Sequence, residues 1–128
     1  MARILLVDDD LGIRVSTGRI LEENGYEVSV ATNSAQCLEK IKTKKPDLVL
    51  LDIMMPDEDG WEACRKIKAD ERTKDIPVVM FTVQTSDDSV EKSLKYAHAD
   101  AHIGKPFYRK KLLDTIERLL TQAGKTKL

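Results

Sequence analysis

Four short apolar runs in this chain each end in polar residues of the kinds that bind metal ions or phosphate. These residues are Asp8, Asp9 and Asp10 after 4–7, Asp52 after 48–51, Thr82 after 78–81, and Lys105 after 103–104. In an open parallel α/β sheet, ligands bind at the carboxyl ends of the strands, where the strand order reverses. If the four runs are parallel strands, carboxylates, a hydroxyl and an ammonium group meet at one edge of a sheet. Such a set can hold a divalent cation and a phosphoryl group together.

The chemistry that this set favours is phosphoryl transfer onto a carboxylate. Adjacent carboxylates such as Asp8 and Asp9 repel each other, and a divalent cation of the Mg²⁺ type, which prefers oxygen ligands, relieves the repulsion. Asp52 on a neighbouring strand can supply a further oxygen. A carboxylate beside a metal ion can attack phosphorus and form an aspartyl-phosphate. The charge on the transferred group is then neutralised by the cation and Lys105, with Thr82 as a hydrogen-bond donor.

The composition indicates one globular domain. The chain has 128 residues, with 21 basic against 22 acidic side chains, so no excess of positive charge suggests binding to nucleic acid or to a membrane. No apolar stretch approaches the roughly 18 residues that span a bilayer, and the N-terminus lacks the pattern of a signal peptide. Cys37 and Cys64 have no CxxC spacing. We therefore expect them to be reduced core residues of a cytoplasmic protein.

Strand and helix patterns alternate along the chain. We expect strands at 3–7, 27–31, 48–52, 77–82 and 101–104, and helices at 11–24, 34–44, 60–70, after Ser86, and at 109–122. Strands one, three and four are continuous apolar runs, as expected where helices cover both faces of a sheet, whereas strands two and five fit its edges. The pattern predicts a flavodoxin-like, doubly wound α/β fold. Its five-stranded parallel sheet has the order 2-1-3-4-5, with five helices in three layers.

Local signals refine the helices. Asp10 is expected to cap the first helix, and Gly25 follows it where a left-handed residue belongs. Val90 and Leu94 are expected to face the core from the helix that begins after Ser86. Trp61 opens the third helix and should be half-buried against the loop that precedes it.

Taken in order, these motifs resemble the receiver domain of two-component response regulators, in particular the single-domain type found among chemotaxis regulators. The resemblance covers residues 3–122. The motifs that carry it are Val-Asp-Asp-Asp at 7–10, Leu-Asp-Ile-Met-Met-Pro at 51–56 with Gly60, Phe-Thr at 81–82, and Lys-Pro-Phe at 105–107. We therefore expect a receiver domain at 1–122 and a short tail at 123–128.

The resemblance implies a phosphorelay function centred on Asp52. Asp52 would accept a phosphoryl group from a sensor histidine kinase or a histidine phosphotransfer protein, and Mg²⁺ or Mn²⁺ would be required. The implied metal-binding residues are Asp8, Asp9, Asp52 and the backbone carbonyl of Met54. Thr82 would be the switch hydroxyl and Lys105 the phosphate-binding ammonium. The peptide bond between Lys105 and Pro106 is expected to be cis.

Two positions depart from the family pattern. Val83 follows the switch threonine where receivers usually have Ala or Gly, and it is expected to slow phosphoryl entry and loss. His102 stands where receivers usually have Tyr or Phe, and we expect it to change how the phosphorylation signal reaches the surface formed by the fourth helix and the fifth strand. His102 is also a candidate pH-sensitive residue. Its spacing from His98 does not predict a metal site, because a helix end and a strand separate them.

Two other functions compete with this one. In a phosphatase of the haloacid-dehalogenase type, Asp8 and Asp10 would be the acids, but Asp52 and the motif after it would then have no role. A docking module that is independent of phosphorylation would not need the complete pocket. The preferred interpretation is a signalling domain that catalyses only its own phosphorylation and dephosphorylation. It would act on a downstream protein partner or a fused output domain.

The chain is either a stand-alone receiver or a piece of a larger regulator or hybrid kinase. The first Met and the charged tail favour the stand-alone form. The basic residues Arg109, Lys110 and Lys111 are expected to form the solvated face of the last helix.

Overall fold

The computed structural model describes residues 1–124. The strands are β1 Arg3–Val7, β2 Glu27–Ala31, β3 Leu48–Leu51, β4 Val78–Thr82 and β5 Ala101–Gly104. The helices are α1 Leu11–Glu23, α2 Ser34–Thr43, α3 Gly60–Ala69, α4 Asp87–Glu91 and α5 Arg109–Gln122, and the π-helical segment η1 spans Lys92–Tyr96. Apart from its first two residues, the predicted tail at 123–128 lies outside the described residues.

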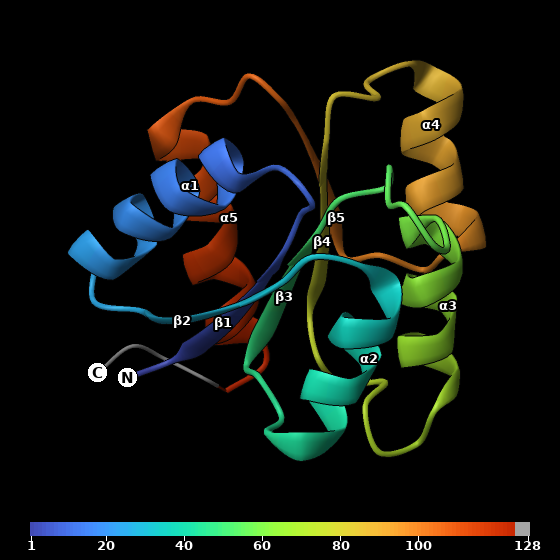
Figure 1. Ribbon diagram of the computed structural model, residues 1–128, viewed down its shortest axis with the longest axis horizontal. Coiled ribbons are helices and arrows are strands. Elements are labelled where there is room, and N and C mark those ends of the chain that lie inside the picture. Colours follow the sequence, from blue (N-terminus) through green and yellow to red (C-terminus); the bar gives the residue numbers. More distant parts are fainter. Residues whose placement is uncertain (125–128) are drawn as a thin grey trace.

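All five strands are parallel and lie in the order β2-β1-β3-β4-β5, as predicted. The two strands with broken apolar patterns are the edges, and the three continuous apolar runs lie between them. In Figure 1, α1 and α5 cover one face of this sheet, and α2, α3 and α4 cover the other. The three-layer, doubly wound arrangement is therefore confirmed.

Alternate residues of each central strand enter different halves of the core. In β1, Leu5 and Val7 pack with buried residues of α2 and α3, whereas Ile4 and Leu6 pack with those of α1 and α5. This alternation follows from the two-residue period of a strand. It explains why the central strands are apolar at every position except Arg3 at the start of β1 and Thr82 at the end of β4, since helices cover both of their faces.

The predicted caps are present at both ends of α1. The Asp10 carboxylate accepts a hydrogen bond from the amide of Ile13 at 3.0 Å. Gly25 has a φ of 88°, which is the left-handed conformation expected after the helix. These caps fix where α1 begins and ends, and so they fix the turn between β1 and α1 that carries the acidic residues.

The helix after Ser86 differs from the prediction. Val90 is half-buried, but Leu94, which was expected to face the core, is 43% exposed. The reason is that α4 passes into the π-helical segment η1, where the amide of Ala97 bonds to the carbonyl of Lys92. A π turn contains an extra residue, so the inward face shifts and Ser93 becomes the fully buried residue.

Among residues 1–124, no helix is both long and apolar enough to cross a membrane.

Candidate functional site

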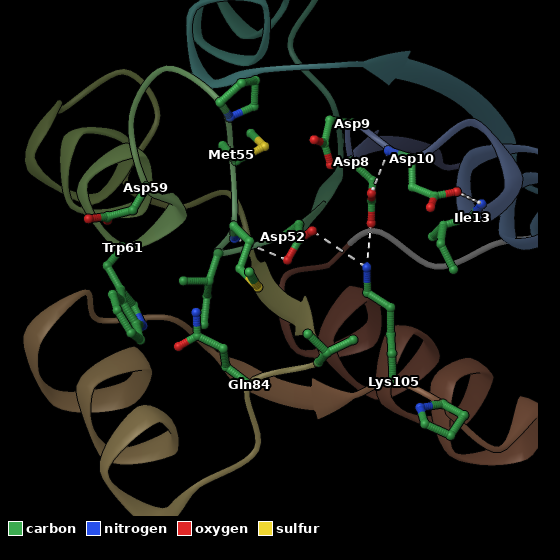
Figure 2. A pocket seen from close by; sticks show the side chains of 15 residues that line it. Asp8, Asp9, Asp10, Ile13, Asp52, Met55, Asp59, Trp61, Gln84 and Lys105 are labelled. Atoms are coloured by element: carbon green, nitrogen blue, oxygen red, sulfur yellow. Dashed lines mark hydrogen bonds and ion pairs between the residues drawn. The ribbon is translucent and has the colours of Figure 1, made fainter.

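The polar strand ends predicted from the sequence meet in one open cleft at the carboxyl edge of the sheet (Figure 2). The charged residues that line it are Asp8, Asp9, Asp10, Asp52, Asp59 and Lys105. They come from the β1–α1 turn, the loop after β3 and the end of β5. Thr82 ends β4 and is fully buried, directly before Val83, which lines the cleft. The sheet topology thus brings together side chains that are up to 97 residues apart in the sequence.

Lys105 is the cation among these acids. Its side chain is only 9% exposed. In Figure 2 its Nζ donates to Oδ2 of Asp8 and forms an ion pair of 3.6 Å with Oδ2 of Asp52. Its backbone amide donates to the carbonyl of Thr82 at 2.8 Å, which ties the ends of β4 and β5 together. The bond between Lys105 and Pro106 is cis, as predicted.

Asp52 lies on the floor of the site, buried and held at both its backbone and its side chain. Its amide donates to the carbonyl of Val7 at 3.0 Å, and its Oδ1 accepts from the amide of Met54 at 3.2 Å. Burial raises the pKa of the Asp52 carboxyl because it disfavours the charged form, and the nearby Asp8 raises it further. Lys105 and the Met54 amide lower this pKa but do not fully offset the burial.

Three carboxylates form a cluster suited to a metal ion. One oxygen from each of Asp8, Asp9 and Asp52 lies within 4.8 Å of the other two. All three donors are oxygens, which are the ligands that Mg²⁺ and Mn²⁺ prefer. Asp9 is exposed to solvent and so remains accessible to an ion with its waters. The donor set therefore fits a hard divalent cation, whose charge would offset the repulsion among the carboxylates.

Asp10 lines the same cleft but has a different task. Its carboxylate caps α1, and its amide donates to Oδ1 of Asp8 at 2.9 Å. The haloacid-dehalogenase alternative requires this carboxylate as a catalytic acid. Because the carboxylate is used as a helix cap, the structure gives that alternative no support.

Thr82 is buried at the end of β4, and the two residues after it, Val83 and Gln84, line the cleft. A hydrogen-bonding influence of the Thr82 hydroxyl, weaker than that of Lys105 or the Met54 amide, also lowers the pKa of Asp52. Its Oγ1 also accepts from the amide of Gln84 at 3.3 Å. Val83, between them, is 59% exposed, and its side chain borders the cleft. Val83 is therefore an exposed apolar residue at the border of the cleft.

His102 belongs to a hydrogen-bond chain that runs from α3 to the β4–α4 loop. The indole Nε1 of Trp61 donates to Oγ of Ser93 at 3.0 Å, and Ser93 Oγ lies 2.8 Å from Nδ1 of His102. The other ring nitrogen, Nε2, lies 2.8 Å from the carbonyl oxygen of Gln84. An indole N–H only donates and a carbonyl only accepts. The chain is therefore fully satisfied when Ser93 donates to Nδ1 and His102 is neutral with its proton on Nε2. Burial, the main cause, lowers the pKa of His102 and favours this neutral form.

The loop between Asp52 and α3 is fixed by hydrogen bonds. The carboxylate of Asp57 accepts from the amides of Ser34 and Ala35, both at 3.0 Å, so the loop is tied to the start of α2. Asp59 caps α3, and the amide of the next residue, Gly60, donates to the carbonyl of Ile53 at 2.8 Å. The backbone that carries Asp52 is therefore held on both sides.

Sequence reasoning missed two residues around this site. Arg14 donates from its Nη1 to the backbone carbonyl of Asp8 at 2.9 Å, and Ser93 is the centre of the His102 chain. Arg14 had a visible signal, since it is a cation in the first turn of a helix that follows three acids. Ser93 had none, because its burial depends on the π-helical segment.

Other candidate groups have structural roles. His98 is exposed, and both ring nitrogens of His102 have protein partners, so the two histidines do not form a metal site. Cys37 and Cys64 are free and buried, as predicted, and burial raises the pKa of each thiol to about 12. Trp61 is partly buried and lines the cleft, as expected.

The basic residues of α5 lie on its solvated face, also as predicted. Arg109, Lys110 and Lys111 are exposed, and Lys110 pairs with Asp114 of the same helix at 2.7 Å.

A doubly wound sheet of this order, with a carboxylate cluster and a lysine at its carboxyl edge, defines a receiver-type α/β domain. The sequence matches the response regulator receiver domain over residues 4–117, and the chain belongs to that family. Receiver domains of this family bind Mg²⁺ at an acidic cluster, and the cluster of this chain has the corresponding composition.

Named relatives agree with this placement. The chain is 40% identical over 121 residues to the phosphate regulon transcriptional regulatory protein PhoB of Pseudomonas aeruginosa, covering 94% of this chain and 52% of PhoB. It is 39% identical over 118 residues to the response regulator MprA of Mycobacterium leprae, covering 92% of this chain and 50% of MprA. This chain thus spans about half the length of the curated relatives it matches.

Solved structures match over nearly their whole length. A CheY-like response regulator receiver domain protein from Methanospirillum hungatei superposes with a TM-score of 0.89 at 38% identity, covering 98% of both chains. The chemotaxis response regulator CheY4 of Vibrio cholerae gives a TM-score of 0.86 at 32% identity, covering 94% of this chain and 99% of CheY4.

Proposed function

We propose that this receiver domain accepts a phosphoryl group on Asp52 and requires Mg²⁺ or Mn²⁺ to do so. The observation that carries the proposal is the joint placement of Asp52, the acidic pair Asp8 and Asp9, and Lys105 in one cleft. In the proposed site Asp9, Asp52 and the backbone carbonyl of Met54 would hold the metal ion, and Asp8 would complete the acidic pocket. When bound, the ion would neutralise charge on the phosphoryl oxygens.

The transfer step follows from this arrangement. An oxygen of Asp52 attacks phosphorus, the bond between phosphorus and the donor nitrogen of a phosphohistidine breaks, and that nitrogen leaves with the electron pair. The Lys105 ammonium then stabilises the charge on the phosphoryl oxygens, and Thr82 donates a hydrogen bond to one of them.

The phosphoryl donor is a sensor histidine kinase or a histidine phosphotransfer protein. On phosphorylation, Thr82 and His102 act as the switch that changes the surface formed by α4 and β5. That surface signals to a downstream protein partner or a fused output domain, without direct contact of this domain with nucleic acid or membrane. The proposed receiver unit is 1–122, it works in the cytoplasm, and it catalyses only its own phosphorylation and dephosphorylation.

The test is to map the phosphorylated residue. The protein is incubated with acetyl phosphate and Mg²⁺, and the acyl phosphate is trapped by borohydride reduction and located by mass spectrometry. We expect stoichiometric label at Asp52 that disappears in Asp52→Asn and persists in the matched control Asp10→Asn. Label that remains in Asp52→Asn at the wild-type level would refute the assignment. Steady turnover of p-nitrophenyl phosphate would instead favour a phosphatase.

A further inference from the structure

Arg14 is in an unfavourable place for the helix that carries it. It belongs to the first turn of α1, which contains no acid and where the helix dipole disfavours a cation. The N-cap Asp10 lies four residues before it, but its carboxylate bonds to the amide of Ile13, and among the described residues no ion pair joins it to Arg14. The Arg14 side chain is half-buried and reaches back over the helix start to the carbonyl oxygen of Asp8, 2.9 Å from Nη1. Helix stability therefore does not explain the arginine, whereas the Asp8 carbonyl gives it a specific partner.

Asp8 is bonded at every polar group. Its amide donates to the carbonyl of Ala31 at 3.1 Å, and its two carboxylate oxygens accept from the amide of Asp10 and from Lys105. The Arg14 guanidinium takes the remaining group, the backbone carbonyl. These bonds fix the end of β1 and the direction in which the chain leaves it.

Asp9 has no comparable support of its own. Within residues 1–124 the structure shows no hydrogen bond or ion pair to its carboxylate, which is exposed and lies in the cluster with Asp8 and Asp52. The position of Asp9 therefore depends on its backbone. Because a peptide unit is planar, the bond from Arg14 to the Asp8 carbonyl also sets the plane from which the Asp9 Cα projects.

We infer that Arg14 is a positioning residue for the metal site: by holding the Asp8 carbonyl it places the Asp9 carboxylate to bind the cation. The inference rests on the proposed Mg²⁺ site. It predicts that removing Arg14 weakens Mg²⁺ binding, whereas simple electrostatics predicts that it strengthens this binding. A cation bound to the backbone of Asp8 repels a divalent ion at the neighbouring carboxylates, so removing its charge alone would tighten Mg²⁺ binding. Loss of positioning weakens it, and loss of groups that orient metal ligands typically costs 10- to 100-fold in affinity.

The test measures the Mg²⁺ dissociation constant by calorimetry at fixed ionic strength. Arg14→Met removes the charge and the donors but keeps much of the side-chain length. Arg14→Lys keeps the positive charge but replaces the planar guanidinium group, with its fixed N–H donors, by an ammonium group. Arg19→Met is the matched control, because it removes an equal charge from an exposed position of the same helix. We expect about tenfold weaker binding for Arg14→Met, an intermediate loss for Arg14→Lys, and no loss for Arg19→Met.

Urea denaturation without metal measures the stability of each variant. A purely structural role of Arg14 would lower that stability but leave the Mg²⁺ dissociation constant of the folded protein unchanged. Unchanged or tighter binding in Arg14→Met overturns the inference. If Arg14→Met does not fold, Arg14→Lys decides, since binding equal to wild type would then overturn it. Absence of Mg²⁺ binding by the wild-type protein is a different result, because it refutes the proposed metal site itself.

Discussion

Gly60 lies tightly against the backbone of Asp52 and Ile53. A Cβ atom added there would lie 2.2 Å from the carbonyl oxygen of Asp52 and 2.8 Å from the Cα of Ile53. Real Cβ atoms essentially never approach closer than 3.0 Å. In Gly60→Ala the Asp52 carbonyl and the start of α3 must therefore separate by at least 0.8 Å, the difference between 3.0 and 2.2 Å. The atoms in the way are backbone atoms, so no side-chain rotation relieves the contact.

We expect two effects from this displacement. Overpacking of a well-packed site typically costs about 1–3 kcal/mol in the free energy of unfolding. A shift of about 1 Å in a reacting group can cost about 100-fold in rate, so phosphorylation of Asp52 by acetyl phosphate should also slow strongly. Urea denaturation followed by circular dichroism gives the first quantity, and the rate of acyl-phosphate formation gives the second.

Gly18→Ala is the matched control. Its added Cβ would lie 3.9 Å from Cγ1 of Val28, which is ordinary contact, and Gly18 is within α1. Alanine is favoured over glycine inside a helix by about 1 kcal/mol, so this variant should be slightly stabilised and phosphorylated normally. If Gly60→Ala is as stable as wild type and reacts within threefold of its rate, the close-contact argument is wrong.

Three further predictions concern individual side chains. Val83→Ala should speed both gain and loss of the phosphoryl group on Asp52, because it removes bulk from the border of the cleft. Lowering the barrier by about 1.4 kcal/mol makes a step tenfold faster. Measured rate constants for both steps within twofold of wild type would contradict the steric account. Asp9→Ala should weaken Mg²⁺ binding, measured by Trp61 fluorescence. Asp10→Ala should mainly lower the free energy of unfolding, by about 1 kcal/mol, because the cap of α1 is lost. Equal losses of Mg²⁺ affinity in the two variants would show that the pocket is wrongly assigned. His102 should make stability fall as the pH drops below 6.5, the ordinary pKa of its side chain, because its folded pKa is lower and the unfolded chain binds the proton first. Its contribution is fully present above that pH, and an equal pH dependence in His102→Gln would exclude it as the cause.

The order of strands and helices was predictable because it depends on local patterns. Apolar residues that repeat every two positions in a strand, or every 3.6 positions in a helix, indicate which side chains face the core. Continuous apolar runs such as 48–51 also indicate that helices cover both faces of the strand. The short segments that follow the strands then determine the candidate site, since parallel strands present their carboxyl ends at the same edge of the sheet. For this reason the amino-acid sequence alone was enough to place Asp52 and Lys105 in the same site.

Tertiary packing determined which residues of the fourth helical region are buried and which groups His102 and Arg14 contact. The spacing of apolar residues along the sequence does not encode these features. The π turn at η1 adds a residue to the helix, which turns Leu94 outward and buries Ser93. The partners of His102 and Arg14 likewise depended on which loop packs beside each side chain. A hydrogen bond needs two groups within about 3 Å in the right orientation, and that condition depends on the relative placement of elements rather than on either segment alone. The sequence by itself therefore determined the fold and the residues of the candidate site, whereas the tertiary structure determined the contacts that hold those residues in position.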